Sequence, residues 1–172
     1  GAVLGRESEA AEFLEAWQQA LATVTERLAK ASHRPTRVFL ESRVGLGAGC
    51  CETMTRGIMG RFVTAAGGVN VAEAMVPGEA GTISLEWLLA HPPEVYIGSA
   101  IGNANQPADA LWLALGVGVD RTLARDKLAR SLSREGIATL EAIRKGRAHA
   151  IWHHFYTSPF NVVAVQAFAK WQ

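Results

Sequence analysis

The most constraining feature of this chain is a repeated alternation between short, continuously apolar stretches and longer segments with helical periodicity. Residues 37–41, 95–98 and 148–152 are three such apolar stretches, each bounded by turn-forming residues. Short apolar runs of this kind are typical of strands that are covered on both faces. Because helical segments separate them, the pattern predicts an α/β fold with an open, mostly parallel sheet flanked by helices.

The longest helix is expected near the start of the chain. Apolar residues recur there at helical spacing, which predicts a helix over residues 9–31 with Ser8 as its cap and Pro35 beyond its end. Further helices are expected at residues 52–66, 85–90, 123–132, 137–143 and 159–171, and a short strand at 69–72. Ser84 is expected to cap the helix at 85–90, and Pro159 to occupy the first position of the helix at 159–171.

Composition and charge exclude several classes of protein. The 172 residues are 49% apolar and 19% charged, which excludes a disordered segment. Lys plus Arg number 17 against 16 for Asp plus Glu, so the basic excess typical of nucleic-acid binders is missing. Glycine, proline and asparagine interrupt the uncharged stretches, so no segment reads as a membrane span of about 20 residues.

The ends of the sequence suggest that it is a piece of a longer protein. The chain does not begin with Met, no signal peptide precedes Gly1, and a helical pattern is still running at Gln172. The alternative is a complete small protein from which a tag has been removed.

The glycine-rich segment after the first predicted strand has the setting of a dinucleotide-binding loop. Gly45, Gly47 and Gly49 follow that strand, but Cys50 stands where a third glycine is needed, and no acidic residue follows near Gly67 to bind a ribose. The segment therefore favours a loop in which the glycines allow close backbone approach. A small nucleotide-binding enzyme domain is the alternative.

The adjacent Cys50 and Cys51 cannot build a disulfide framework. We expect them to be small apolar residues at the start of a helix. A soft-metal site is the other reading, but it lacks a nearby histidine to complete it.

Polar and aromatic residues follow the predicted strands at their carboxyl ends. Ligands of open α/β sheets bind at that edge. We therefore expect a ligand site lined by Arg43, Ser99, Asn103, His153, His154 and Tyr156. Arg43 would pair with an anion or else be solvated, and the two histidines would contact ligand, ligate a bare metal ion, or divide into one packed and one solvated ring. The GxSxG motif of a nucleophile elbow does not occur, and we predict no catalytic residue.

Four segments, in order, resemble one family. Residues 61–72 contain Gly67-Gly68-x-Asn70-x-Ala72, residues 83–97 contain Ser84-x-Glu86 followed by Pro93-Glu94, and residues 142–151 contain Gly146-Arg147. Together with residues 152–171, these segments resemble periplasmic substrate-binding proteins of ABC importers for ferric siderophores, haem and cobalamin. Glu94 departs from the pattern, which usually has Asp after this proline.

The resemblance implies a protein of two α/β lobes joined by one long helix. Residues 1–34 would be that inter-lobe spine helix and residues 35–172 the C-terminal, Rossmann-like lobe, with the N-terminal lobe absent. The implied function is to bind an iron complex, such as a ferric siderophore or a related metal chelate, and to deliver it to the membrane permease. The implied protein is not an enzyme, has no resident cofactor, and is periplasmic or an extracytoplasmic lipoprotein.

The resemblance also gives Glu86 a role. It matches the acidic residue with which the C-terminal lobe docks onto arginines of the ABC permease, whereas helix-dipole pairing alone would explain an acidic residue at a helix start. The ligand contacts are not matched by motif and rest on position. We further expect the isolated lobe to bind cargo weakly, and exposed apolar surface to favour a homodimer.

Overall fold

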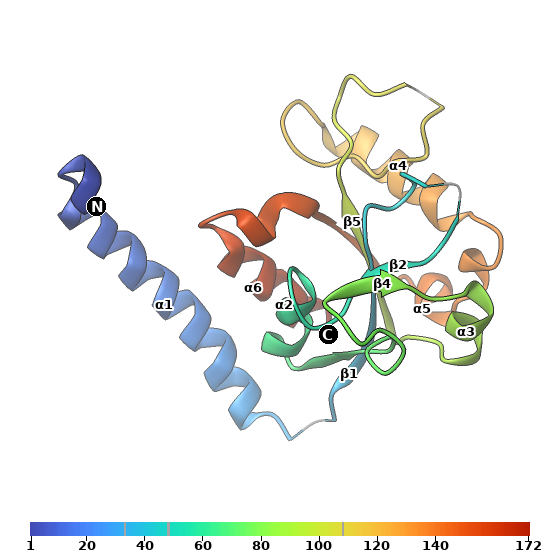
Figure 1. Ribbon diagram of the computed structural model, residues 1–172, viewed down its shortest axis with the longest axis horizontal. Helices are drawn as coiled ribbons and strands as arrows, with labels where there is room; N and C mark the ends of the chain where they lie inside the picture. Colours follow the sequence, from blue (N-terminus) through green and yellow to red (C-terminus); the bar gives the residue numbers. More distant parts are fainter. Residues whose placement is uncertain (33, 48, 108) are drawn as a thin grey trace.

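The structure is a computed structural model that describes residues 1–32, 34–47, 49–107 and 109–172. One long helix, α1 (Glu7–Lys30), follows a short 3₁₀ turn (Ala2–Leu4) and runs along one side of an α/β unit (Figure 1). This arrangement confirms the expected long first helix. The helix begins at Glu7 rather than beyond Ser8, and Arg6 takes the cap position.

Six strands within the described residues form one mixed, mostly parallel sheet. They are β1 (Thr36–Glu41), β2 (Glu52–Met54), β3 (Gly68–Asn70), β4 (Ala80–Thr82), β5 (Val95–Ala100) and β6 (Ala148–Trp152). The order is β4-β2-β1-β5-β6, and β3 pairs with the first half of β1. The pairs β1–β3, β1–β5 and β5–β6 are parallel, whereas β1–β2 and β2–β4 are antiparallel. The predicted fold class is therefore confirmed.

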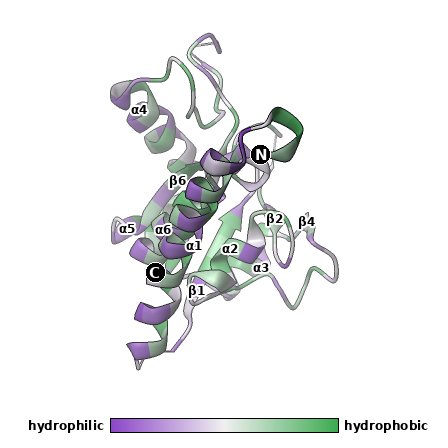
Figure 2. Cartoon of the chain, turned by 90° about the vertical axis from the view of Figure 1, so that its left-hand side faces the viewer, coloured by the Kyte–Doolittle hydropathy of each residue, from purple (hydrophilic) through white to green (hydrophobic). Residues whose placement is uncertain are grey.

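Helices cover both faces of this sheet. They are α2 (Gly60–Ala65), α3 (Leu85–Ala90), α4 (Arg121–Leu132), α5 (Glu141–Arg144) and α6 (Asn161–Trp171), with 3₁₀ turns at Ile137–Thr139 and His153–Thr157. Successive strand residues point to opposite faces, so Val38 and Leu40 of β1 pack with α2 and α6, while Phe39 packs with α3 and α5. Strand β5 is buried throughout and β1 is buried from Val38 onward, so this part of the sheet lies between two apolar layers. Figure 2 shows hydrophobic residues gathered at the centre of the molecule.

Helix α1 contacts the lobe mainly through α6. The Phe13 and Phe160 rings meet edge to face, with centroids 5.5 Å apart, and Trp17 Nε1 donates a hydrogen bond to Asn161 Oδ1 at 3.1 Å. Val24 is the buried residue of this helix. Within the described ranges, none of the helices combines the length and apolar character needed to cross a bilayer.

The helix predicted over residues 52–66 is wrong in its first half. Residues 52–54 are strand β2, which pairs with both β1 and β4, and the helix that follows is only Gly60–Ala65. Thr53 shows why, because its hydroxyl donates to the Leu40 carbonyl at 2.7 Å and accepts from the buried Asn70 amide at 3.1 Å. These partners are distant in sequence, and their pairing overrides local helical periodicity.

Two smaller corrections concern the C-terminal half. The helix expected at 137–143 is divided into a 3₁₀ turn and the short α5. Pro159 precedes the last helix, which begins at Asn161 with Phe160 as its cap. The Ser84 cap of α3 is confirmed, since its Oγ accepts the Trp87 N–H at 3.1 Å.

Candidate functional site

The carboxyl ends of β1, β5 and β6 bring three of the predicted site residues into one hydrogen-bonded chain. The backbone N–H of Arg43 donates to Ser99 Oγ at 2.8 Å, and Ser99 Oγ lies 2.9 Å from Nδ1 of His153. Ser99 is completely buried and His153 nearly so. Because β1–β5 and β5–β6 are parallel, their carboxyl ends meet at one edge, where Ser99 near the end of β5 lies with residues that follow β1 and β6, as expected from their positions in the sequence.

Burial sets the protonation state of His153. Desolvation lowers the pKa of His153, the nearby His154 and Arg43 lower it further, and Glu52 opposes them. A neutral ring at neutral pH follows. The Ser99 hydroxyl accepts from the Arg43 N–H and lies within hydrogen-bond distance of Nδ1, where the tautomer of the ring sets which atom donates.

Arg43 is held at both its backbone and its side chain. Its φ of 46° lies in the left-handed region, which costs a non-glycine residue energy and persists only when neighbours fix it. Ser99 fixes the backbone N–H, and the guanidinium forms an ion pair with Glu52 of β2. Arg43 is therefore not simply solvated, and an anionic ligand would have to compete with Glu52 for its guanidinium.

An aromatic group surrounds this chain at the turn after β6. The His153 ring meets Tyr156 and His154 edge to face, with centroids 5.3 Å and 5.5 Å apart, and Trp152 lies 5.4 Å from His154. His153 is buried and His154 exposed, which matches the reading of one packed and one solvated ring. Among the residues that the structure describes, no three His, Cys, Asp or Glu side chains gather in a way that could hold a metal ion.

Asn103 stands apart from this cluster. It is exposed in the loop after β5, and its side-chain oxygen accepts the N–H of Asn105 at 2.9 Å. No hydrogen bond in the described ranges links it to Arg43, Ser99 or His153. The local turn, rather than the site, accounts for its side-chain contact.

The loop that carries Asn103 is anchored from α4 by a buried lysine. Lys127 Nζ donates to the carbonyls of Pro107 and Ala110 at 3.2 Å and 2.6 Å, and Ser131 Oγ donates to that of Leu111 at 3.0 Å. Lys127 itself is 3% exposed. Sequence reasoning missed this anchor, which holds the loop beside the site.

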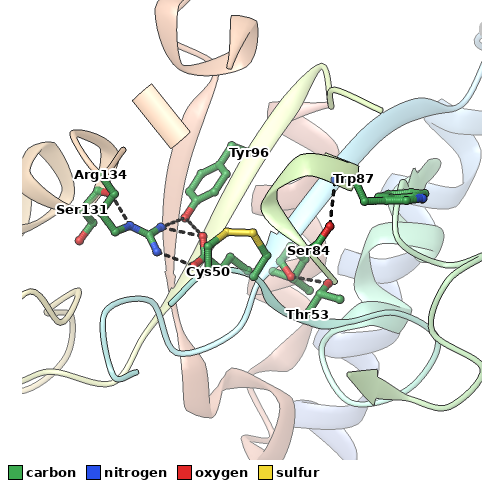
Figure 3. Close-up of a disulfide and its surroundings, with 10 residues drawn as sticks. Cys50, Thr53, Ser84, Trp87, Tyr96, Ser131 and Arg134 are labelled. Carbon is green, nitrogen blue, oxygen red and sulfur yellow. Dashed lines mark hydrogen bonds and ion pairs between the residues drawn. A yellow bond between two sulfur atoms is a disulfide. The ribbon is translucent and has the colours of Figure 1, made fainter. Parts of the chain in front are cut away.

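A second missed feature is a buried network around Glu41, the last residue of β1. Arg134 donates two hydrogen bonds of 2.7 Å to the Glu41 carboxylate, and the Tyr96 hydroxyl donates a third to the same carboxylate (Figure 3). Burial and the neighbouring Glu41 charge raise the pKa of Tyr96 well above its ordinary value, so Tyr96 stays a donor. The sequence pattern placed Glu41 at the end of a strand, but no sequence pattern near either residue identifies Arg134 as its partner.

The glycine-rich segment does not have the setting of a nucleotide site. It connects β1 to the antiparallel strand β2, so its described residues lead into a strand and not into a helix whose N-terminus could meet a dinucleotide phosphate. Gly45 has a φ of +83°, and a Cβ there would lie 2.3 Å from the Leu111 carbonyl oxygen. This glycine therefore allows close backbone approach, as predicted, and the nucleotide alternative is not supported.

The two cysteines also differ from expectation. Cys50 and Cys51 are joined to each other by a disulfide and precede strand β2 rather than a helix. Bonded sulfurs are not thiolate ligands, so the soft-metal reading fails for this state. The bond joins two adjacent residues and does not cross-link distant segments. The two cysteines therefore build no disulfide framework, as expected.

Glu86 is exposed in the first turn of α3, where Ser84 caps the helix. This position suits a surface contact, and nothing in the fold assigns the partner.

Comparison with known proteins connects this arrangement to solved structures. The TroA-like periplasmic binding protein FepB from Veillonella parvula superposes with a TM-score of 0.86 at 19% identity, over 98% of this chain and 48% of that one. The periplasmic haem-binding protein RhuT from Roseiflexus sp. RS-1 gives 0.67 at 18% identity, over 99% and 59%. An ABC-type Fe³⁺-hydroxamate transport protein from Saccharomonospora viridis gives 0.64 at 19% identity, over 96% and 50%.

These likenesses establish the fold, and the chain spans about half the length of the structures it matches. Among curated proteins, no sequence is significantly similar to it. The family model described as "Periplasmic binding protein" matches residues 1–147, which is most of the chain. The chain therefore belongs to the periplasmic binding protein family, whose members are extracytoplasmic solute-binding proteins and not enzymes.

Proposed function

We propose that this chain is the C-terminal lobe and spine helix of a two-lobe protein that binds an iron complex for an ABC importer. Residues 1–34 would form the inter-lobe spine and residues 35–172 the lobe, with cargo held between this lobe and a second one. The protein would work in the periplasm or as an extracytoplasmic lipoprotein.

The observation that carries the proposal is the Arg43–Ser99–His153 chain at the carboxyl edge of the sheet. The Arg43 guanidinium, the neutral imidazole of His153 and the neighbouring Tyr156 ring all belong to the carboxyl edge of the sheet, where open α/β sheets bind ligands, and this supports the proposal. The names of RhuT and of the Saccharomonospora protein refer to haem and to Fe³⁺-hydroxamate, which supports an iron complex as the cargo.

The charge balance of the site bears on the kind of chelate. Glu52 already neutralises Arg43, and His153 is uncharged at neutral pH. A strongly anionic chelate would have to displace Glu52, whereas a chelate of low net charge could stack on the aromatic group and accept hydrogen bonds without doing so. We therefore favour a ferric hydroxamate or a similar weakly charged complex over a ferric tricatecholate.

Substitutions at the site test the cargo proposal in the protein that contains both lobes. Arg43→Ala and Tyr156→Ala are each expected to weaken binding of a ferric trihydroxamate by about tenfold, or about 1.4 kcal/mol, because each removes one direct contact. Calorimetric titration measures this, with a ferric tricatecholate and haem as comparison ligands. The exposed Arg144, changed to alanine, is the matched control and should leave the affinity unaltered.

Tyr156→Phe separates the contribution of the ring from that of the hydroxyl. If neither Arg43→Ala nor Tyr156→Ala changes the affinity for any of these ligands, both residues lie outside the site. The 172-residue chain alone is expected to bind weakly, since about half of the proposed cleft is contributed by the other lobe.

We also propose that Glu86 docks onto a basic residue of the permease. Its exposed position at the start of α3 allows a partner to approach, and charge complementarity at such a rim mainly steers encounter. Glu86→Lys should abolish uptake by the reconstituted importer while leaving cargo affinity intact. Glu135→Lys, another exposed acidic position, is the control, and equal uptake by both variants would refute the docking role.

We also propose that the lobe associates with a second copy of itself, because it exposes large apolar residues such as Leu14 and Val163. A strictly monomeric sedimentation profile would count against it.

A further inference from the structure

The Cys50–Cys51 disulfide has no part in the cargo site described above, yet its two sulfurs lie in very different surroundings. Cys51 is completely buried in the apolar layer that contains Phe39, Leu88 and Tyr96. Cys50 is only half-buried. Figure 3 shows the bond together with the side chains of Tyr96, Arg134 and Ser84.

A pocket of about 200 Å³ opens onto Cys50 and not onto Cys51. Gly45, Gly47 and Gly49 form one wall of it, and the remaining walls come from the ends of β1, β2 and β4. Its lining includes Glu41, Arg43, Cys50, Glu52 and Thr82. Since these three glycines carry no side chains, they leave room for a small molecule beside Cys50.

The charges around this pocket are already compensated. Arg43 pairs with Glu52, and Glu41 is held by Arg134 and Tyr96. Neither carboxylate faces the pocket unpaired, so an approaching thiolate would meet little net repulsion, and Arg43 is a cation at the pocket wall.

We propose that Cys50–Cys51 is a thiol-exchange site, at which a small thiol of the glutathione class enters the pocket and attacks Cys50 Sγ. The thiolate forms a new S–S bond to Cys50, the Cys50–Cys51 bond breaks, and its electron pair goes to Cys51 Sγ, which takes up the proton released by the thiol. A second thiol then attacks the outer sulfur of the mixed disulfide. The two small thiols leave joined to each other as a disulfide, and Cys50 becomes a free thiol. Two electrons pass from the two small thiols to the protein disulfide.

Exchange at Cys50 would act on the segment that presents Arg43. The loop from Arg43 to Cys51 is closed at its base by the Ser42 N–H, which donates to the Glu52 carbonyl at 2.7 Å, and Ile83 N–H donates to the Cys51 carbonyl at 3.3 Å. The disulfide adds a covalent constraint to this closed loop. Reduction removes that constraint directly beside the Arg43–Glu52 pair, and so couples the redox state of the protein to the cargo-facing edge. The exchange chemistry itself does not depend on the identity of the cargo.

The test uses the unmodified chain in native buffer with reduced glutathione, quenched in acid at short times. Tandem mass spectrometry is expected to find the first glutathione adduct on Cys50, with little or none on Cys51, because only Cys50 reaches the pocket. Adducts distributed equally between the two, or reduction that occurs only in urea concentrations that unfold the chain, would overturn the proposal.

Filling the pocket gives a second, independent measurement. Thr82→Trp places a large side chain at the pocket wall and is expected to slow reduction by glutathione about tenfold. Thr122→Trp, at an exposed position of α4 outside the pocket, is the matched control and should retain the wild-type rate. Equal rates for the two variants would show that the thiol does not reach Cys50 through this pocket, and cargo binding enters neither readout.

Discussion

Replacing Arg134 with alanine is expected to lower the free energy of unfolding by about 3–5 kcal/mol. The reason is the Glu41 carboxylate, whose side chain is 3% exposed and would lose the two hydrogen bonds from Arg134 that now compensate its burial. Tyr96 alone would remain as a donor. Urea unfolding followed by circular dichroism measures the change, with the unfolding slope checked for two-state behaviour.

A matched control comes from an ion pair of the same geometry at the surface. Arg34 also binds a carboxylate through two nitrogens, at 2.7 Å and 2.8 Å to Glu94, but its side chain is 71% exposed. Arg34→Ala should therefore change the unfolding midpoint little, since water replaces the lost partner. The double variant Glu41→Gln, Arg134→Ala should recover part of the loss. An Arg134→Ala variant as stable as Arg34→Ala would show that Glu41 does not depend on its arginine.

Replacing Gly45 with alanine is expected to cost about 2–3 kcal/mol and to lower the melting temperature by roughly 5–10 °C. Alanine at a φ of +83° is strained, and its Cβ would overlap the backbone of Leu111 and Trp112. The two loops would then have to separate, which would weaken the hydrogen bond of 3.1 Å between the Leu113 N–H and the Val44 carbonyl. Differential scanning calorimetry measures the effect.

Gly47→Ala is the control for this change. Nothing lies within 4 Å of a Cβ built at Gly47, and its φ lies outside the left-handed region. The variant should therefore be as stable as the wild type or slightly more stable, because alanine restricts the unfolded chain. If the two alanine variants have the same melting temperature, the packing of the two loops does not stabilise the fold.

The parts of the site that could be predicted are those fixed by the ends of strands. The apolar runs of β1, β5 and β6 are strong local signals, and parallel pairing then forces the following residues to one edge. Arg43, Ser99 and His153 were identified on that basis, and they are hydrogen-bonded as a chain. Asn103 follows strand β5, but it lies too far past the end of that strand for strand pairing to fix its position. A local turn, with the Asn105 N–H bonded to the Asn103 side chain, holds it instead.

The sequence by itself determined the α/β class, the long first helix, the buried strands and the edge at which polar groups collect. Each of these follows from periodicity and from residues close together in the chain. The tertiary structure alone decided that residues 52–54 form a strand, that Glu41 meets an arginine 93 positions away, and that Cys50 is accessible while Cys51 is buried. Those outcomes depend on which distant groups the sheet brings together, because burial makes an unpaired carboxylate or an unpaired strand edge costly and leaves the choice of partner to the fold.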